Sequence, residues 1–196
     1  VEVEGTVGVV TLEPGIVCTG DVENETYTFA ITESISANVI NNVAKFENIN
    51  VFQGSYLEKI FTYDGSLDQR FILDNSFIDT SKIVVFVKNK NDQGNGTQYT
   101  LANDIIDINS ESKIFLIKEV QDEKYELKFG DGFFGKKLGQ GPNKDGDVIT
   151  VRYITTDGED GNGVQRFSFS GLFKSGAITI NVVETPTVST ISKAQN

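Results

Sequence analysis

Apolar and polar residues alternate with a period of two along most of this chain. Tyr125, Leu127 and Phe129 share one face of a predicted half-buried strand, with charged residues between them. Residues 83–87 and 113–118 are apolar runs rich in β-branched side chains, which is typical of strands covered on both faces. Predicted strands cover 3–12, 26–31, 60–63, 69–73, 83–87, 113–118, 124–129, 148–155, 166–170 and 177–183.

Turn-forming residues separate these strands. Asp64-Gly65 and residues 121–123 each stand between two predicted strands and predict hairpins. Residues 88–97 form a polar loop, and only residues 33–45 resemble a short helix, whose Asn and β-branched content disfavours it. The pattern therefore predicts a mainly β protein, built as a sandwich or as two small barrels with at most one or two short helices.

Composition limits the possible partners. The chain has 196 residues, of which 38% are hydrophobic and 23% charged, as in a globular protein. Its 17 basic and 28 acidic side chains give a net charge of −11, which repels nucleic acid and anionic lipid. The densest basic run, Lys136-Lys137, is too short to reverse this, so we expect no nucleic-acid or membrane partner.

Missing residue types exclude several chemistries. Without histidine the chain has no imidazole base or His–Cys zinc site, and the lone Cys18 forms no internal disulfide. No apolar run is long enough for a membrane span, and no signal peptide is visible. Methionine is absent even at position 1, so we expect an internal fragment of a longer protein.

The segment 125–141 matches two nucleotide-binding patterns. Gly130, Gly132 and Gly135 match the dinucleotide-binding pattern G-x-G-x-x-G. Gly130, Gly135 and Lys136 match G-x-x-x-x-G-K, which is the phosphate-loop pattern without its final Ser or Thr. Both patterns require a helix directly afterwards, whose N-terminus holds the phosphate. The next twelve residues contain three glycines and a proline, which disfavour a helix by roughly 6 kcal/mol. The sequence therefore predicts no nucleotide site here.

The same glycines fit a turn. Phe129 ends a strand, and Gly130 and Gly132 can take the positive φ angles of a sharp reversal, with Gly135 closing the segment. The Asp131 carboxylate is expected to accept hydrogen bonds from nearby backbone amides and so fix the turn. Phe133 and Phe134 are then expected to return to the core. We expect this turn to keep strand 124–129 in register with strand 148–155.

Acidic segments suggest no specific catalytic or metal site. Residues 157–163 look like a calcium loop, but Gly161 and Asn162 stand where an EF-hand needs an oxygen ligand and a glycine. A glycine-rich connection between domains explains this segment better, and residues 145–147 are interpreted in the same way; whether these loops bind a cation stays open. No nucleophile stands beside a recognisable base, so we expect no enzyme, no cofactor and no metal site.

One block resembles a known family. Residues 125–138 (YELKFGDGFFGKKL), followed by 146–153 (GDVITVRY), resemble the baseplate wedge proteins of contractile-tailed bacteriophages, the baseplate J-like family. Residues 48–56, 69–73 and 79–81 look like further signatures of that family. Residues 155–163 resemble its "G-x-x-G-N" junction, which in this chain comprises Gly158, Gly161, Asn162 and Gly163. Gln53, where many relatives carry Glu, and a small insertion at 142–145 depart from the family pattern.

The resemblance implies a discontinuous layout. Residues 1–49 and 158–190 are expected to form one J-like β domain, and 50–157 a second β domain inserted into it and carrying the FGDG turn. Residues 191–196 are expected to lead into a downstream region that the chain lacks.

The resemblance also implies a structural role in the virion tail baseplate, in a protein made in the host bacterial cytoplasm. The expected partners are other wedge subunits and copies of itself, in a ring that surrounds the hub and rearranges on sheath contraction. By itself the fragment is expected to be monomeric or weakly associating, because like charge opposes association. The alternative is a receptor- or carbohydrate-binding β module of a tail fibre or adhesin.

Overall fold

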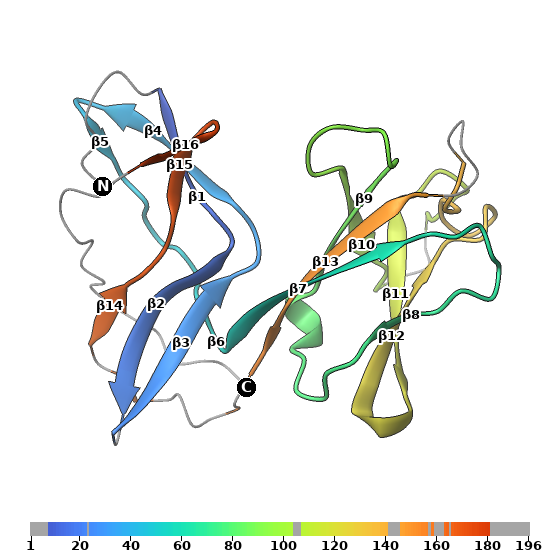
Figure 1. The fold of residues 1–196 in the computed structure, drawn as a ribbon, viewed down its shortest axis with the longest axis horizontal. Helices are drawn as coiled ribbons and strands as arrows, with labels where there is room; N and C mark the ends of the chain where they lie inside the picture. The colour runs from blue at the N-terminus through green and yellow to red at the C-terminus, as the bar shows by residue number, and fades with distance from the viewer. Residues whose placement is uncertain are drawn as a thin grey trace. The chain divides into compact units, whose positions relative to one another are not determined.

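A computed structural model describes residues 8–22, 24–103, 107–140, 146–156, 158, 163–164 and 166–180. The chain divides into two compact units. One, the discontinuous unit, combines Val1–Tyr56 with Thr156–Asn196, and the other, the inserted unit, is Leu57–Thr155 (Figure 1). The chain thus leaves the first unit once, builds the second from one continuous stretch, and returns.

The discontinuous unit contains two antiparallel sheets. Thr11 of one sheet pairs with Lys174, and Cys18 of the other pairs with Phe169, so both sheets join the two ends of the chain. The five-stranded sheet has the order β16 (Ile178–Ile180), β15 (Phe173–Ser175), β1 (Val9–Leu12), β4 (Ile35–Ile40) and β5 (Val43–Ala44). The four-stranded sheet has the order β14 (Phe167–Phe169), β2 (Gly15–Val22), β3 (Glu25–Ile31) and β6 (Phe52–Gln53).

Aromatic rings from the returning segment complete the core of the discontinuous unit. Phe167 meets Phe29 edge-on with ring centroids 5.1 Å apart, and Phe169 stacks on Phe173 at the same distance. Val10 and Leu12 of β1 are fully or almost fully buried in this core. The buried members are Val10, Leu12, Val17, Cys18, Phe29, Ile31, Ala44 and Phe173.

The inserted unit is a single seven-stranded sheet that curls into a nearly closed barrel. β9 pairs antiparallel with β10 and β13, and β12 with β11 and β8, whereas β10 and β11 pair in parallel. Its short helical segments are the 3₁₀ turns η1 (Thr80–Lys82) and η2 (Gln121–Glu123). The strand order is β7 (Ser55–Thr62), β13 (Val148–Thr155), β9 (Val84–Lys88), β10 (Thr97–Leu101), β11 (Ile114–Val120), β12 (Lys124–Phe129) and β8 (Phe71–Leu73).

Side chains close the gap between the two edge strands of this sheet. Phe61 of β7 and Phe71 of β8 meet edge-on with ring centroids 5.6 Å apart. Near them, the Gln69 side-chain amide donates to the Thr62 carbonyl at 2.8 Å, and its oxygen accepts from the Asp64 amide at 2.9 Å. The strand edges are therefore bridged by rings and side-chain hydrogen bonds rather than by a ladder.

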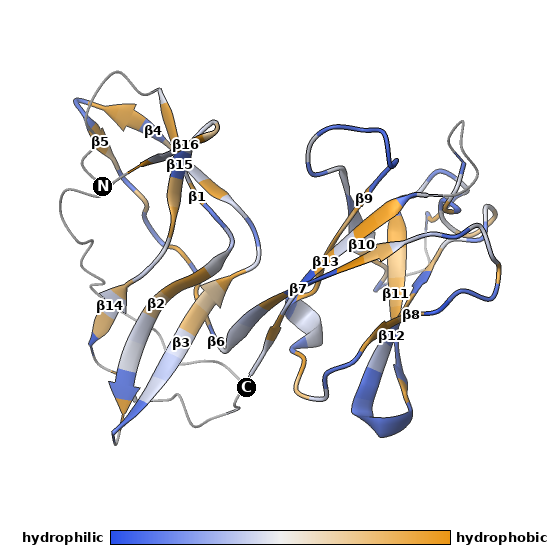
Figure 2. Cartoon of the chain, in the orientation of Figure 1, coloured by the Kyte–Doolittle hydropathy of each residue, from blue (hydrophilic) through white to orange (hydrophobic). Residues whose placement is uncertain are grey.

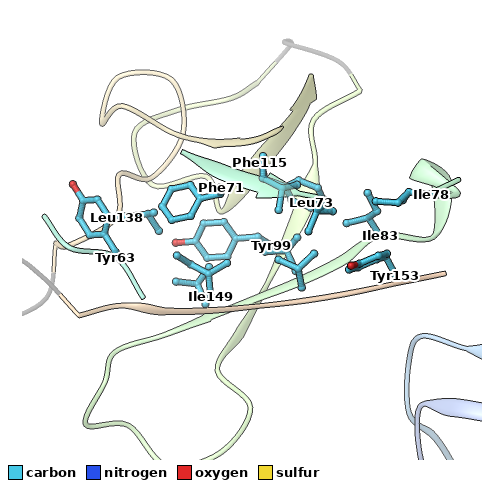
Figure 3. Packing of buried hydrophobic residues seen from close by; sticks show 14 residues of the cluster. Tyr63, Phe71, Leu73, Ile78, Ile83, Tyr99, Phe115, Leu138, Ile149 and Tyr153 are labelled. Carbon is cyan, nitrogen blue, oxygen red and sulfur yellow. The ribbon is translucent and has the colours of Figure 1, made fainter. Parts of the chain in front are cut away.

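Period-two alternation places the core inside the barrel. On β13, Ile149, Val151 and Tyr153 point inward and are almost fully buried, whereas Arg152 points outward and pairs with Glu58 at 3.0 Å. Figure 2 shows the same division, with hydrophobic residues along β9 and β13 and hydrophilic residues in the β11–β12 hairpin. Figure 3 shows the core residues from close by and labels Tyr63, Phe71, Leu73, Ile78, Ile83, Tyr99, Phe115, Leu138, Ile149 and Tyr153.

The prediction of a mainly β protein is confirmed, as is the hairpin at 121–123, where Val120 pairs with Lys124. The short helix at 33–45 is wrong, because this segment forms the hairpin β4–β5. Asn41 and Asn42 take positive φ angles of 50° and 62°, which suit a two-residue hairpin turn. The two asparagines, which disfavour a helix, therefore mark the position of the turn.

Three predictions about pairing and cover are wrong. The strands on either side of Asp64-Gly65 form no hairpin, because β7 and β8 are opposite edges of the sheet. Strand 124–129 is not in register with 148–155; it pairs with β11 and β8, while β13 pairs with β7 and β9. Residues 113–118 are not covered on both faces along their whole length, since Ile114 is buried but Leu116, on the same outer face of β11, is exposed.

The unit boundaries differ slightly from the expected 50 and 157. Residues 50–56 belong to the discontinuous unit, because Phe52 and Gln53 pair with Ala30 and Phe29 of β3. On the return, Thr156 donates to the side-chain oxygen of Gln53 at 2.8 Å. The chain therefore changes units after Tyr56 and again at Thr156.

Candidate functional site

The FGDG turn is held by its own aspartate. The Asp131 carboxylate oxygen Oδ1 accepts hydrogen bonds from the backbone amides of Phe133 and Phe134, both at 2.8 Å. These bonds, first that from Phe134 and then that from Phe133, hold the pKa of Asp131 below its usual value. The expected role of Asp131 in fixing the turn corresponds to this geometry, with amides two and three residues onward as donors.

The remaining amides of the loop are also used inside the protein. Gly132 donates to the Gly135 carbonyl at 3.1 Å, and Gly135 donates to the Asn109 carbonyl at 3.1 Å. Lys136 donates to the Ser112 carbonyl at 2.7 Å. Every backbone amide from 132 to 136 thus has an internal acceptor. The loop offers no cradle of free amides, which is what a phosphate loop uses to hold its ligand.

The three glycines of the turn are required for different reasons. Gly130 follows Phe129 without a positive φ, but a Cβ there would overlap the backbone of Gly135. Gly132 has open space around it and a φ of 96°, which L side chains rarely adopt. Gly135 has a φ of 82°, and a Cβ there would lie 2.7 Å from the Ile114 side chain. Positive φ therefore applies to Gly132 and Gly135 but not to Gly130.

The two phenylalanines of the turn do not return to the core as expected. Phe133 is 91% exposed and Phe134 is half-buried. The backbone amides of both residues donate to the Asp131 carboxylate, which holds the loop in this conformation. The turn thus presents an aromatic ring to solvent on a loop that is fixed by internal hydrogen bonds.

A cavity of about 320 Å³ lies beside the turn, within the inserted unit. Four lysines line it, from β9, from the segment before β11 and from the segment after the turn. Sequence patterns do not indicate this cluster, because its lysines are spread over residues 88–137 and two of them are adjacent. The lining residues are Val87, Lys88, Asn89, Asp92, Gly96, Thr97, Tyr99, Lys113, Lys136, Lys137, Gln140 and Asp147.

Among the residues that the structure describes, one of the four lysines forms an ion pair. Lys136 pairs with Glu111 at 3.1 Å. Lys88 donates to the Gly94 carbonyl at 3.0 Å, and Lys113 donates to the Thr97 hydroxyl at the long distance of 3.5 Å. For Lys137 the structure records only a longer-range attraction to Asp131 among the described residues.

Asp147 lines the cavity and is almost fully buried. Its Oδ2 accepts from the Gly139 amide at 2.7 Å, and its Oδ1 accepts from the Asn89 side chain at 3.4 Å. Burial, helped by the negative charges of Asp147 and Glu111, raises the pKa of Tyr99 to about 12. Figure 3 shows the Tyr99 ring between Phe71 and Ile149. Tyr99 is therefore a core side chain that also lines the cavity.

A buried carboxylate on β12 went undetected in the sequence. Alternation predicts that Glu126 faces solvent, yet it is almost fully buried. Its two oxygens accept from Arg70 Nε at 3.0 Å and from Arg70 Nη2 at 3.1 Å, and Lys128 lies 3.4 Å away. These partners, Arg70 first, lower the pKa of Glu126. The Arg70 side chain reaches it from the residue before β8, so the pair ties the barrel's edge strand to β12.

The predicted domain junction is described in part. Gly158 and Gly163 take positive φ angles of 71° and 105°, as a glycine-rich connection allows, and Gly161 and Asn162 lie outside the described residues. Within the described ranges, no group of three or more His, Cys, Asp or Glu side chains is placed to hold a metal ion. Helices long and apolar enough to cross a membrane are absent from the same ranges.

No protein-family model matches this sequence, and no curated protein matches it.

Proposed function

We propose that this chain is part of a structural subunit of the baseplate wedge of a contractile phage tail. The observation that carries the proposal is the FGDG turn, which lies in the block that resembles the baseplate J-like family. The turn uses its amides internally and projects Phe133 into solvent. A rigid loop with an exposed aromatic ring suits contact with another protein, because little conformational entropy is lost when it is buried.

The partners in this proposal are other wedge subunits and copies of the same protein, assembled into the ring that surrounds the hub. The net charge of −11 favours protein partners over nucleic acid. The bridged barrel of the inserted unit supplies a stiff support for the turn. The fragment by itself is proposed to be monomeric or weakly associating, and to act in the virion tail baseplate.

Co-expression with the other wedge proteins of the same phage, followed by size-exclusion chromatography, tests this function. We expect the chain, within its full-length protein, to co-elute with at least one of them. Replacing the exposed ring in Phe133→Ser should weaken co-elution, whereas Phe77→Ser, a matched change at another exposed phenylalanine, should not. Absence of any co-eluting wedge protein would contradict the proposal.

A sugar-binding or receptor-binding module is the competing function. Sugars stack on platforms of neighbouring aromatic rings, and among the described residues the exposed aromatic side chains are Phe77 and Phe133, which come from separate loops. Specific hits on a glycan array, lost in Phe133→Ser, would replace the assembly role with this one.

A further inference from the structure

We propose that the lysine-lined cavity beside the FGDG turn binds a compact anion that carries phosphate groups. The fold brings Lys88, Lys113, Lys136 and Lys137 to one cavity from three separate segments of the inserted unit. This site does not depend on the proposed baseplate role, since neither the exposed Phe133 ring nor a partner protein is needed to form it.

The balance of charges inside the cavity carries the argument. The whole chain has 28 acidic and 17 basic side chains, so a lysine placed without preference would meet a carboxylate easily. Yet Lys88 donates to a carbonyl, Lys113 donates weakly to a hydroxyl, and Lys137 is in no recorded ion pair with a described residue. Four ammonium groups around one space repel each other, and a bound anion would turn this repulsion into attraction.

The two carboxylates of the cavity do not neutralise it. Asp147 is buried, and its oxygens already accept from the Gly139 amide and the Asn89 side chain. Asp92 belongs to the exposed loop between β9 and β10. Among the described residues of the lining there are four positive and two negative side chains, and Glu111 outside it pairs with Lys136. The cavity is therefore a local region of positive charge on an acidic protein.

The kinds of donor present select phosphate over carboxylate. The described lining residues include no arginine, whose planar fork matches a carboxylate. Lysines act as point charges with three donors each, and they suit the oxygens of a tetrahedral phosphate from several directions. Thr97, Asn89 and Gln140 add neutral donors to the same lining. The volume of about 320 Å³ is several times that of a water molecule, about 30 Å³, so a two-phosphate ion fits better than a halide.

Binding here differs from a phosphate loop in its source of donors. The amides from 132 to 136 are taken up within the loop, so recognition depends on side chains alone. The half-buried or exposed lysine side chains must be ordered by the ligand, and their attraction to it is screened by salt. The affinity should therefore fall steeply with ionic strength, and a nucleoside should add nothing to it.

Titration of the ¹⁵N-labelled chain with inorganic pyrophosphate tests the site by NMR. At about 0.01 M ionic strength, where the screening length is about 30 Å, we expect saturable shifts confined to residues 87–97, 113, 136–140 and 146–147. Citrate, a carboxylate of similar charge, should bind more weakly, and ATP should bind no more tightly than pyrophosphate. Equal or tighter binding of citrate, or tighter binding of ATP, would overturn the phosphate assignment.

Two matched variants locate the binding. Lys113→Gln combined with Lys137→Gln removes two charges from the cavity and should weaken pyrophosphate binding by at least about tenfold. Lys118→Gln combined with Lys128→Gln removes the same charge from exposed lysines of the β11–β12 hairpin, outside the cavity, and should change binding by less than about threefold. Equal losses in both, or no saturable shift in the unaltered chain, would overturn the proposal. A thermal melt of each variant confirms that it is folded.

Discussion

The two units of this protein are both β structures, but they differ in how their strands meet along the chain. The inserted unit closes one sheet around one core with strands from the continuous stretch Leu57–Thr155. The discontinuous unit has two sheets, and each needs a strand from the far end of the chain, as the pairing of Thr11 with Lys174 shows. β15 can meet β1, and β14 can meet β2, only after a loop that contains the whole inserted unit has been closed.

This difference indicates which of the two units can fold without the other. The inserted unit holds all the partners of its own sheet, including the Arg70–Glu126 pair that ties β8 to β12. The first 56 residues hold only part of theirs, because rings such as Phe167 and Phe173 arrive with the return segment. The discontinuous unit therefore tolerates the insertion as long as the inserted unit folds by itself.

Cutting the chain at the unit boundaries gives the largest expected effect. A fragment of residues 57–155 should fold and melt cooperatively, because no strand pair of its sheet is lost. A fragment of residues 1–56 should stay unfolded, since β1 and β2 lose β15 and β14, and their core loses three aromatic rings. Circular dichroism melts and amide NMR dispersion measure both. A folded 1–56 fragment, or an unfolded 57–155 fragment, would break the comparison.

Truncating one leucine in each core is the next largest change. Leu127→Ala in the inserted unit and Leu12→Ala in the discontinuous unit each remove an almost fully buried side chain and should cost about 2–5 kcal/mol of unfolding free energy. The single cysteine can be used as a probe that reports the opening of one unit and not of the other. Cys18 is buried in the discontinuous unit, and burial raises its pKa to about 11, so it reacts with thiol reagents only when that unit opens.

We therefore expect Leu12→Ala to accelerate Cys18 labelling strongly and Leu127→Ala to leave it nearly unchanged. Tm by circular dichroism shows that both variants are destabilised to a similar degree. Equal acceleration of labelling by the two variants would show that the units unfold as one, and the independence inferred from strand order would be wrong.

The FGDG turn offers a smaller test within the inserted unit. Gly130→Ala should be the costlier change, because its Cβ would overlap the Gly135 backbone, which the turn cannot move without losing its hydrogen bonds. Gly132→Ala has space and should cost roughly 1–3 kcal/mol from its positive φ alone. Denaturant midpoints of the two variants measure the order. A reversed order would show that φ strain, not close approach, decides this turn.

The Arg70–Glu126 pair gives the smallest effect, which is visible through pH. The lowered pKa of Glu126 means that its charged form stabilises the folded state. This contribution is complete above the unfolded value of about 4.3 and is lost as the pH falls through the lowered folded value. The stability difference between the unaltered chain and Glu126→Gln should therefore shrink on acidification below about pH 4.5.

Local geometry explains what could be predicted from sequence. Tyr125, Leu127 and Phe129 alternate with charged residues, and the strand they predict is present with Leu127 in the core. Asp131 between two glycines predicts a turn fixed by its carboxylate, and the structure has those bonds. Both inferences depend on residues within a few positions of each other, where backbone geometry leaves few choices.

The failures come from partners that are distant in the chain. Glu126 alternates as an exposed residue, but Arg70, 56 positions earlier, covers it and supplies its hydrogen bonds. Strand 124–129 could pair with any neighbour of matching pattern, and β11 and β8 rather than β13 lie beside it. Alternation states which side chains share a face; it does not state which strand lies next to that face.

By itself, the sequence determined that the chain is mainly β and that the 130–135 segment is a turn, because a period of two and the conformations of glycine are properties of a few consecutive residues. Only the tertiary structure decided that Lys88 and Lys113 would meet Lys136 and Lys137 at one cavity. A barrel brings side chains together by strand order and curvature, which are set by the burial of the whole core rather than by any local pattern.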